Sequence, residues 1–185
     1  MENNGGEKIY KLFASLLSYP KEDIKDVVAE CVDALSNDPE YSQEAVKEIE
    51  VFADVVSKLP LDDIEGIYSY TFELSADHTL DLAFHLFDGF KRSNVLVSIK
   101  EMYKANGFPY DRFSKGELPD NLTVILRFLA DLDDQELKKD FRENMVIKAL
   151  EKLSKGFDAH KENVYGNIIK GLLLVIDTDV KKAAA

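Results

Sequence analysis

The chain has 185 residues, of which 45% are hydrophobic and 31% charged, and it contains one cysteine. This composition is typical of a globular protein with a substantial core, and it excludes an internal disulfide. The net charge of −12 disfavours nucleic acid and anionic membranes as partners. Residues 21–90 hold 18 acidic and 4 basic side chains, whereas residues 91–185 hold 15 acidic and 17 basic ones. The acidic half is either a solvated surface or a surface for a basic partner.

The start of the chain, residues 1–6, has neither the basic nor the apolar segment of a secretory signal. No apolar run reaches the roughly 18–20 residues that a membrane span needs. We therefore expect a cytoplasmic protein without direct membrane insertion. We also expect residues 1–185 to form a single helical domain, with the alanines at 183–185 interpreted as an appended tail.

Apolar residues recur at helical spacing along the first half of the chain. Pro20 and Pro60 close the first and third predicted helices. Cys31 lies on the apolar face of the second helix and is interpreted as a small core residue. Asp62 and Glu65 have the spacing of a capping box and predict the start of the fourth helix. The predicted helices of this half cover residues 9–17, 24–35, 46–56, 64–70 and 80–87.

The segment 80–87 is apolar nearly all round, which predicts a helix buried at the centre of a bundle. A buried strand of eight residues is the alternative for this segment. The next predicted helix covers residues 95–103, and Asn106-Gly107 supplies a left-handed stop after it. Residues 108–116 are predicted as a loop.

Two aspartates are expected to cap the helices that follow this loop. Asp120 precedes one apolar pattern, and Asp133 with Glu136 repeats the capping-box spacing before the next. The last three predicted helices cover residues 122–129, 137–153 and 165–176. Because no segment of length alternates with period two, we predict an all-α bundle of about nine helices.

The sequence lacks the common catalytic motifs. It has no glycine-rich phosphate loop, no Gly-x-Ser-x-Gly elbow and no His-Glu-x-x-His. Asp81, His85 and Asp88 are spaced to share one helical face, so a small metal-binding protein or enzyme using them is one alternative. A surface triplet is the simpler interpretation. We expect no catalytic residue, no metal and no cofactor.

Polar groups gather at two helix ends. Glu73 follows an apolar helix end, where it is either a solvated loop residue or a fixed acceptor for a cationic side chain. Asp120, Glu117 and Asn121 form a polar cluster at a helix N-terminus. As a helix cap alone, Asp120 would contribute about 1 kcal/mol.

Several segments match one family pattern in order along the chain. They are Leu16-Leu17-Ser18-Tyr19-Pro20, Tyr68 or Tyr70, Phe72-Glu73, Gly89, Arg92, Tyr103-Lys104-Ala105-Asn106-Gly107-Phe108 and Glu117-Leu118-Pro119-Asp120-Asn121-Leu122. Together they resemble the nitrate reductase delta-subunit (NarJ-type) family, within the TorD-like group of redox-enzyme maturation chaperones. Asn121 stands where this family usually has histidine, and Ser93 where glycine commonly follows the arginine.

The resemblance implies a TorD-like all-α chaperone that is not an enzyme. Such a protein holds the immature catalytic subunit of a molybdopterin-dependent oxidoreductase, at its N-terminal or twin-arginine leader, while the cofactor is inserted. The client surface would comprise Glu73, Arg92, Glu117, Pro119, Asp120 and Asn121, with Tyr70 and Phe72 lining a groove. A generic helical adaptor is the other alternative, and the sequence does not decide between a monomer and a homodimer.

Overall fold

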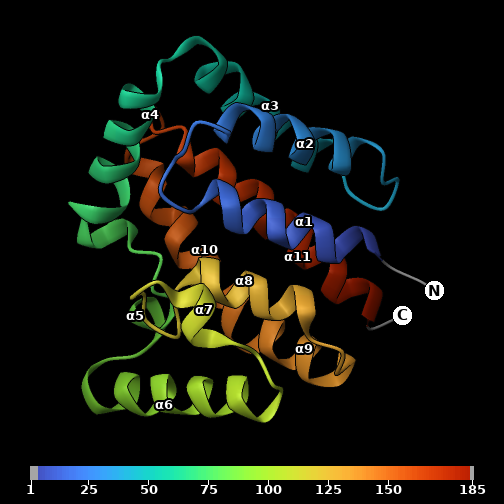
Figure 1. The fold of residues 1–185 in the computed structure, drawn as a ribbon, viewed down its shortest axis with the longest axis vertical. Helices are drawn as coiled ribbons and strands as arrows, with labels where there is room; N and C mark the ends of the chain where they lie inside the picture. Colours follow the sequence, from blue (N-terminus) through green and yellow to red (C-terminus); the bar gives the residue numbers. More distant parts are fainter. Residues whose placement is uncertain (1–3, 184–185) are drawn as a thin grey trace.

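In the computed structural model, which describes residues 4–183, the chain folds into an all-α bundle (Figure 1). The α-helices are α1 (Asn4–Leu16), α2 (Ile24–Ser36), α3 (Gln43–Lys58), α4 (Leu61–Tyr68), α5 (Leu82–Leu86), α6 (Gly89–Ala105), α7 (Tyr110–Ser114), α8 (Leu122–Asp131), α9 (Gln135–Phe141), α10 (Ile147–Gly156) and α11 (Tyr165–Ala183). Two π-helical turns (Ser69–Glu73 and Arg142–Val146) and two 3-10 turns (Ala76–His78 and Phe157–Ala159) accompany them. The prediction of an all-α bundle with about nine helices is confirmed.

The core forms where helices distant in sequence pack together. Helix α1 packs against α2 and α8, α3 against α2 and α11, and α10 against α5 and α11. Because each helix presents an apolar stripe inward, the packing buries one cluster that includes Phe13, Phe52 and Phe128. A Cβ added to Gly171 in α11 would lie 2.7 Å from Cδ1 of Ile49 in α3. The close approach of these two helices therefore depends on a glycine.

A second set of contacts that holds α11 in place is polar. The carboxylate of Asp179 accepts hydrogen bonds from the hydroxyls of Tyr10 (2.6 Å) and Tyr41 (3.0 Å). Arg142 Nη1 lies 3.5 Å from the same carboxylate and donates to the Tyr10 hydroxyl at 3.0 Å. We call these four residues the C-terminal cluster. They join α11 to α1, to the loop before α3 and to the π-helical turn after α9.

The helix boundaries differ from the sequence prediction in four places. The π-helical turn Arg142–Val146 divides the predicted eighth helix into α9 and α10, and α7 occupies part of the predicted loop. Helix α6 begins at Gly89, whose positive φ of 51° suits glycine, well before the predicted start. Helix α5 has five residues and is not buried all round, because Phe84 is 44% exposed. The stop at Gly107, with φ of 66°, is confirmed.

The predicted caps are each displaced. Helix α4 begins after Pro60 without a side-chain cap, so the capping box at Asp62 is wrong. Helix α8 is capped by Asn121 rather than Asp120, and α9 by Asp134 rather than Asp133. Asp120 and Asp133 are each followed directly by another residue that can cap a helix, and the spacing of the sequence does not distinguish between the two neighbours.

Two further expectations concern the core and the chain end. Cys31 is fully buried, as predicted for a core residue. Ala183 is the last residue of α11, while residues 184–185 of the interpreted tail lie outside the described residues. Over residues 4–183, no helix combines the length and apolar character needed to cross a membrane.

Candidate functional site

The segment Glu117–Leu122, which carries four of the eight predicted client residues, is hydrogen-bonded to the start of α5. The carboxylate of Asp120 is wholly buried, and its Oδ2 accepts a hydrogen bond from the backbone N–H of Ala83 at 2.9 Å. The backbone N–H of Leu82 also donates to the backbone carbonyl of Asp120 (3.0 Å), and that of Leu122 donates to the carbonyl of Leu80 (2.8 Å). Asp120 therefore stabilises the junction of α5 and α8 rather than capping the α8 N-terminus.

Arg92 of α6 approaches the same junction. Its Nη2 lies 3.3 Å from Oδ2 of Asp81 and 4.0 Å from Oδ2 of Asp120. We call Asp81, Arg92 and Asp120 the loop cluster. Burial, and then the neighbouring Asp81 charge, raise the pKa of Asp120 to about 6 despite Arg92 and the N–H of Ala83. Among the described residues, Oδ1 of Asp120 and Nε of Arg92 have no hydrogen-bond partner.

The rest of the segment is held by tyrosines and by its own side chains. The Tyr103 hydroxyl donates to the carbonyl of Pro119 and that of Tyr110 to the carbonyl of Glu117, both at 2.7 Å. Asn121 Oδ1 accepts from the backbone N–H and the hydroxyl of Thr123, while its Nδ2 donates to Glu117 Oε2 at 3.2 Å. Pro119 and Asn121 are buried by these contacts. A structural role thus accounts for much of the motif.

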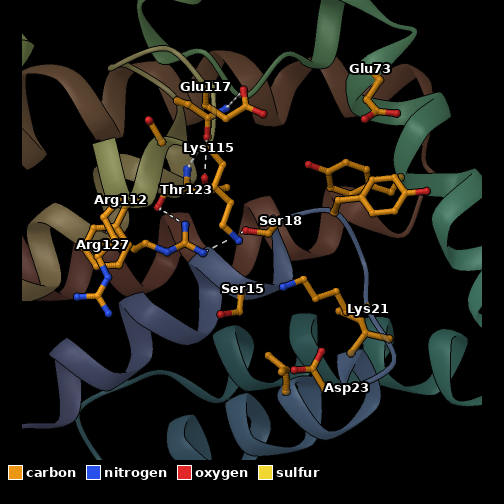
Figure 2. Close-up of a pocket in the computed structure, with 17 residues that line it drawn as sticks. Ser15, Ser18, Lys21, Asp23, Glu73, Arg112, Lys115, Glu117, Thr123 and Arg127 are labelled. Carbon is orange, nitrogen blue, oxygen red and sulfur yellow. Dashed lines mark hydrogen bonds between the residues drawn. The ribbon is translucent and has the colours of Figure 1, made fainter. Parts of the chain in front are cut away.

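A cavity of about 560 Å³, which we call the polar cavity, lies beside this segment (Figure 2). It is bounded by the end of α1, the start of α2, the π-helical turn after α4, and α7 and α8. Its charged lining residues are Lys21, Asp23, Glu73, Arg112, Lys115, Glu117 and Arg127. Among the predicted client residues, Glu73, Glu117 and Asn121 line it, and Glu73 is exposed.

A second depression, of about 900 Å³, runs between α4 and the loop before α11, and we call it the acidic groove. Its apolar lining includes Tyr70 and Leu74, which are 69% and 79% exposed. Four carboxylates also line this groove, from Asp62, Asp63, Asp77 and Glu162. Of the described residues that line it, none is a lysine or an arginine. Such a surface suits a ligand that is both cationic and apolar.

Tyr70 and Phe72 both lie in the π-helical turn Ser69–Glu73 but point to different places. Tyr70 faces the acidic groove, whereas the Phe72 ring packs against Tyr68 (5.1 Å between centroids) and Tyr165 (5.0 Å). Phe72, predicted beside Tyr70 in a groove, therefore contributes to packing behind it. Residues two positions apart on a helix do not face each other, so the spacing of Tyr70 and Phe72 already disfavours a shared groove wall.

The alternative metal site is not assembled. Asp81 precedes α5 and pairs with Arg92, and Nε2–H of His85 donates to the carbonyl of Thr79 at 2.8 Å. Asp88 precedes α6 and is exposed. Throughout the described part of the chain, no group of three or more His, Cys, Asp or Glu side chains is placed to hold a metal ion. The shared helical face required a longer helix than the five residues of α5.

Sequence reasoning missed most of the acidic groove. The acidic excess of residues 21–90 includes Asp62, Asp63 and Asp77, so the charge count was a signal for three of its four carboxylates. Glu162 comes from the other half of the chain, and only the fold brings it to the groove. Leu74 carried no signal, because an apolar residue in a loop is ordinary.

A scan against models of protein families gave no match, and a search of curated proteins found no relative. The resemblance to the NarJ-type and TorD-like chaperones therefore stays a prediction carried by the motif residues.

Proposed function

We propose that the protein is a cytoplasmic, non-catalytic chaperone for a molybdenum-dependent oxidoreductase, and that the acidic groove binds the leader peptide of the immature catalytic subunit. The family resemblance suggests the client. The observation that carries the binding site is the pair of exposed apolar side chains, Tyr70 and Leu74, in a groove that four carboxylates also line. Exposed apolar surface rimmed by charge is typical of an interaction site.

A leader with two adjacent arginines followed by an apolar stretch has the complementary chemistry. Its guanidinium groups can donate charge-assisted hydrogen bonds to the groove carboxylates, each worth ~1.5–3 kcal/mol net. Its apolar stretch can cover Tyr70 and Leu74, at ~25 cal/mol per Å² of apolar surface removed from water. The net charge of −14 over residues 21–90 would steer such a peptide during encounter.

The two walls of the groove are joined beneath the surface. Asn163 Nδ2 in the loop before α11 donates to the Thr71 hydroxyl at 2.7 Å, and that hydroxyl donates to the Ile67 carbonyl at 2.7 Å. The π-helical turn is thus tied to the loop that forms the opposite wall. A groove fixed in this way loses little conformational entropy when a peptide binds.

The test is a fluorescence anisotropy titration of a labelled leader peptide with adjacent arginines. We expect Asp62→Asn/Asp63→Asn to weaken binding at least about tenfold, since loss of one charge-assisted contact corresponds to that factor or more. The matched control is Asp26→Asn/Asp33→Asn, which removes the same charge from the exposed face of α2. The control should retain the wild-type affinity apart from a small steering effect.

Two further comparisons separate the proposal from its alternatives. A peptide with both arginines changed to glutamine should bind more weakly, and binding should fall as salt rises. Equal affinity for the two peptides would favour a generic adaptor, and equal affinity of the two protein variants would place the binding surface elsewhere. Affinity capture from the native host with mass spectrometry should recover a molybdopterin-dependent catalytic subunit with wild-type protein and less of it with Asp62→Asn/Asp63→Asn.

A further inference from the structure

The polar cavity collects basic side chains in a strongly acidic protein. Lys21, Arg112, Lys115 and Arg127 all line it, although they come from the loop after α1, from α7 and the turn after it, and from α8. Figure 2 shows the side chains of Lys21 and Lys115 extending into the cavity toward Ser15 and Ser18. The fold therefore brings together cations that are distant in sequence.

These cations are not neutralised within the protein. Across residues 4–183, ten ion pairs form with nitrogen–oxygen distances within 4.0 Å, and none involves Lys21, Arg112, Lys115 or Arg127. Burial lowers the pKa of Arg127, with no carboxylate offsetting it. Arg127 is half-buried without a counter-charge, which is costly, and an anionic ligand would supply that counter-charge; Lys21, Arg112 and Lys115 are exposed.

The carboxylates of the cavity do not fill this role. Burial, and then the charges of Asp81 and Glu73, raise the pKa of Glu117. The charged groups that act on Glu117 are therefore other carboxylates. Its Oε2 accepts a hydrogen bond from Asn121. Asp23 and Glu73 also line the cavity, and neither pairs with a cation among the described residues. We call Lys21, Lys115 and Arg127 the basic part of the cavity.

The basic part is built around a fixed guanidinium. Arg127 donates from Nη1 to the Thr123 carbonyl at 2.8 Å and from Nη2 to the Ser18 hydroxyl at 3.2 Å (Figure 2). These two bonds orient its planar group and leave Nε–H and other donor positions for a ligand. The hydroxyl of Ser15 donates a hydrogen bond to the Lys11 carbonyl in α1 and adds a polar atom to the lining of the cavity.

We propose that the polar cavity binds a small phosphorylated molecule, with its phosphate among Lys21, Lys115 and Arg127. A dianionic phosphate matches several converging cations better than a single carboxylate does. The cavity volume of about 560 Å³ exceeds that of a phosphate ion and falls in the usual range for small-molecule sites. Tyr19 and Phe113 also line it, so an apolar or aromatic body attached to the phosphate would be covered.

Titration calorimetry with phenyl phosphate, at constant ionic strength set by chloride, tests this site. Wild-type protein should bind the probe saturably with one site per chain. Lys21→Gln/Lys115→Gln should weaken the affinity at least about tenfold, because both lysine charges would lie at close range to the dianionic phosphate. Neither lysine makes a side-chain hydrogen bond or ion pair in the described structure, so thermal melts should show an unchanged fold.

The matched control is Lys47→Gln/Lys170→Gln, which removes the same charge from exposed positions on α3 and α11. This variant should bind phenyl phosphate as the wild type does. Benzoate distinguishes a carboxylate ligand from a phosphate one and should bind at least tenfold more weakly than phenyl phosphate. Three results would each overturn the proposal: no saturable binding by the wild type, equal weakening in both lysine variants, or benzoate binding as tightly as phenyl phosphate.

Discussion

The C-terminal cluster and the loop cluster each bury a carboxylate near an arginine, but they satisfy it differently. Asp179 accepts from two tyrosine hydroxyls and lies 3.5 Å from Arg142, and all four side chains of that cluster have partners. In the loop cluster Asp120 accepts one backbone N–H through Oδ2, and its Oδ1 is without a partner in the described structure. Nη2 of Arg92 lies 4.0 Å from Oδ2 of Asp120.

The difference shows that a buried carboxylate stabilises a fold only through the partners it has. In the C-terminal cluster the charge is spread over strong donors, so removing it leaves those donors buried and unpaired. In the loop cluster the charge is incompletely compensated, and its protonation is favoured by burial. We therefore expect the first cluster to stabilise the protein at neutral pH and the second to make stability depend on pH.

The largest expected effect is that of Asp179→Ala. It leaves Arg142 and the two tyrosine hydroxyls without their acceptor, and breaking a buried pair typically costs about 3–5 kcal/mol. Equilibrium unfolding in denaturant measures the loss of stability. Asp177→Ala is the control, because its pair with Lys181 is exposed and should contribute less than about 1 kcal/mol. Similar losses for the two variants would remove the distinction between the clusters.

The second effect concerns Asp120→Asn and the pH. The pKa of Asp120 is about 6 in the folded protein and ordinarily 3.8, so between these values the folded state binds more proton than the unfolded state. This group's contribution to stability therefore falls as pH rises from about 4 through 6. The loss amounts to about 3 kcal/mol at 1.36 kcal/mol per pKa unit.

Unfolding at pH 4 and at pH 7 measures this contribution. The amide does not titrate, so the stability of Asp120→Asn relative to wild type should increase by about 2.4 kcal/mol between the two pH values, most of the full change. The amide keeps an oxygen to accept the Ala83 N–H. A relative stability that is the same at both pH values would show that Asp120 is compensated as well as Asp179 is.

The fold was largely predictable because most long helices are amphipathic, and the period of apolar residues in α1, α2, α3 and α8 determines both helix and buried face. The π-helical turns were not predictable, because each inserts a residue into the helix and so departs from the 3.6-residue period. Asp120 was noticed as a helix cap, but its burial follows from the approach of α5, which no local pattern encodes. The role of Asp179 is not predictable from the sequence, because its partners Tyr10, Tyr41 and Arg142 are brought to it only by the fold.

The smallest effects are expected from removing one tyrosine hydroxyl, either within the C-terminal cluster or close to the loop cluster. The two losses of stability can be compared directly. Tyr10→Phe deletes a hydroxyl that donates to the Asp179 carboxylate and accepts from Arg142, so we expect a loss of about 1.5–3 kcal/mol, the range for bonds to charged groups. Tyr103→Phe deletes a hydroxyl that donates to the neutral carbonyl of Pro119, and the expected loss is about 0.5–1.5 kcal/mol. Both rings are buried and stay in place, so the two variants differ chiefly in the charge of the lost partner. Denaturant unfolding of both variants at pH 7 gives the comparison, and a loss for Tyr103→Phe as large as that for Tyr10→Phe would mean that the charge of the acceptor does not set the strength of these contacts.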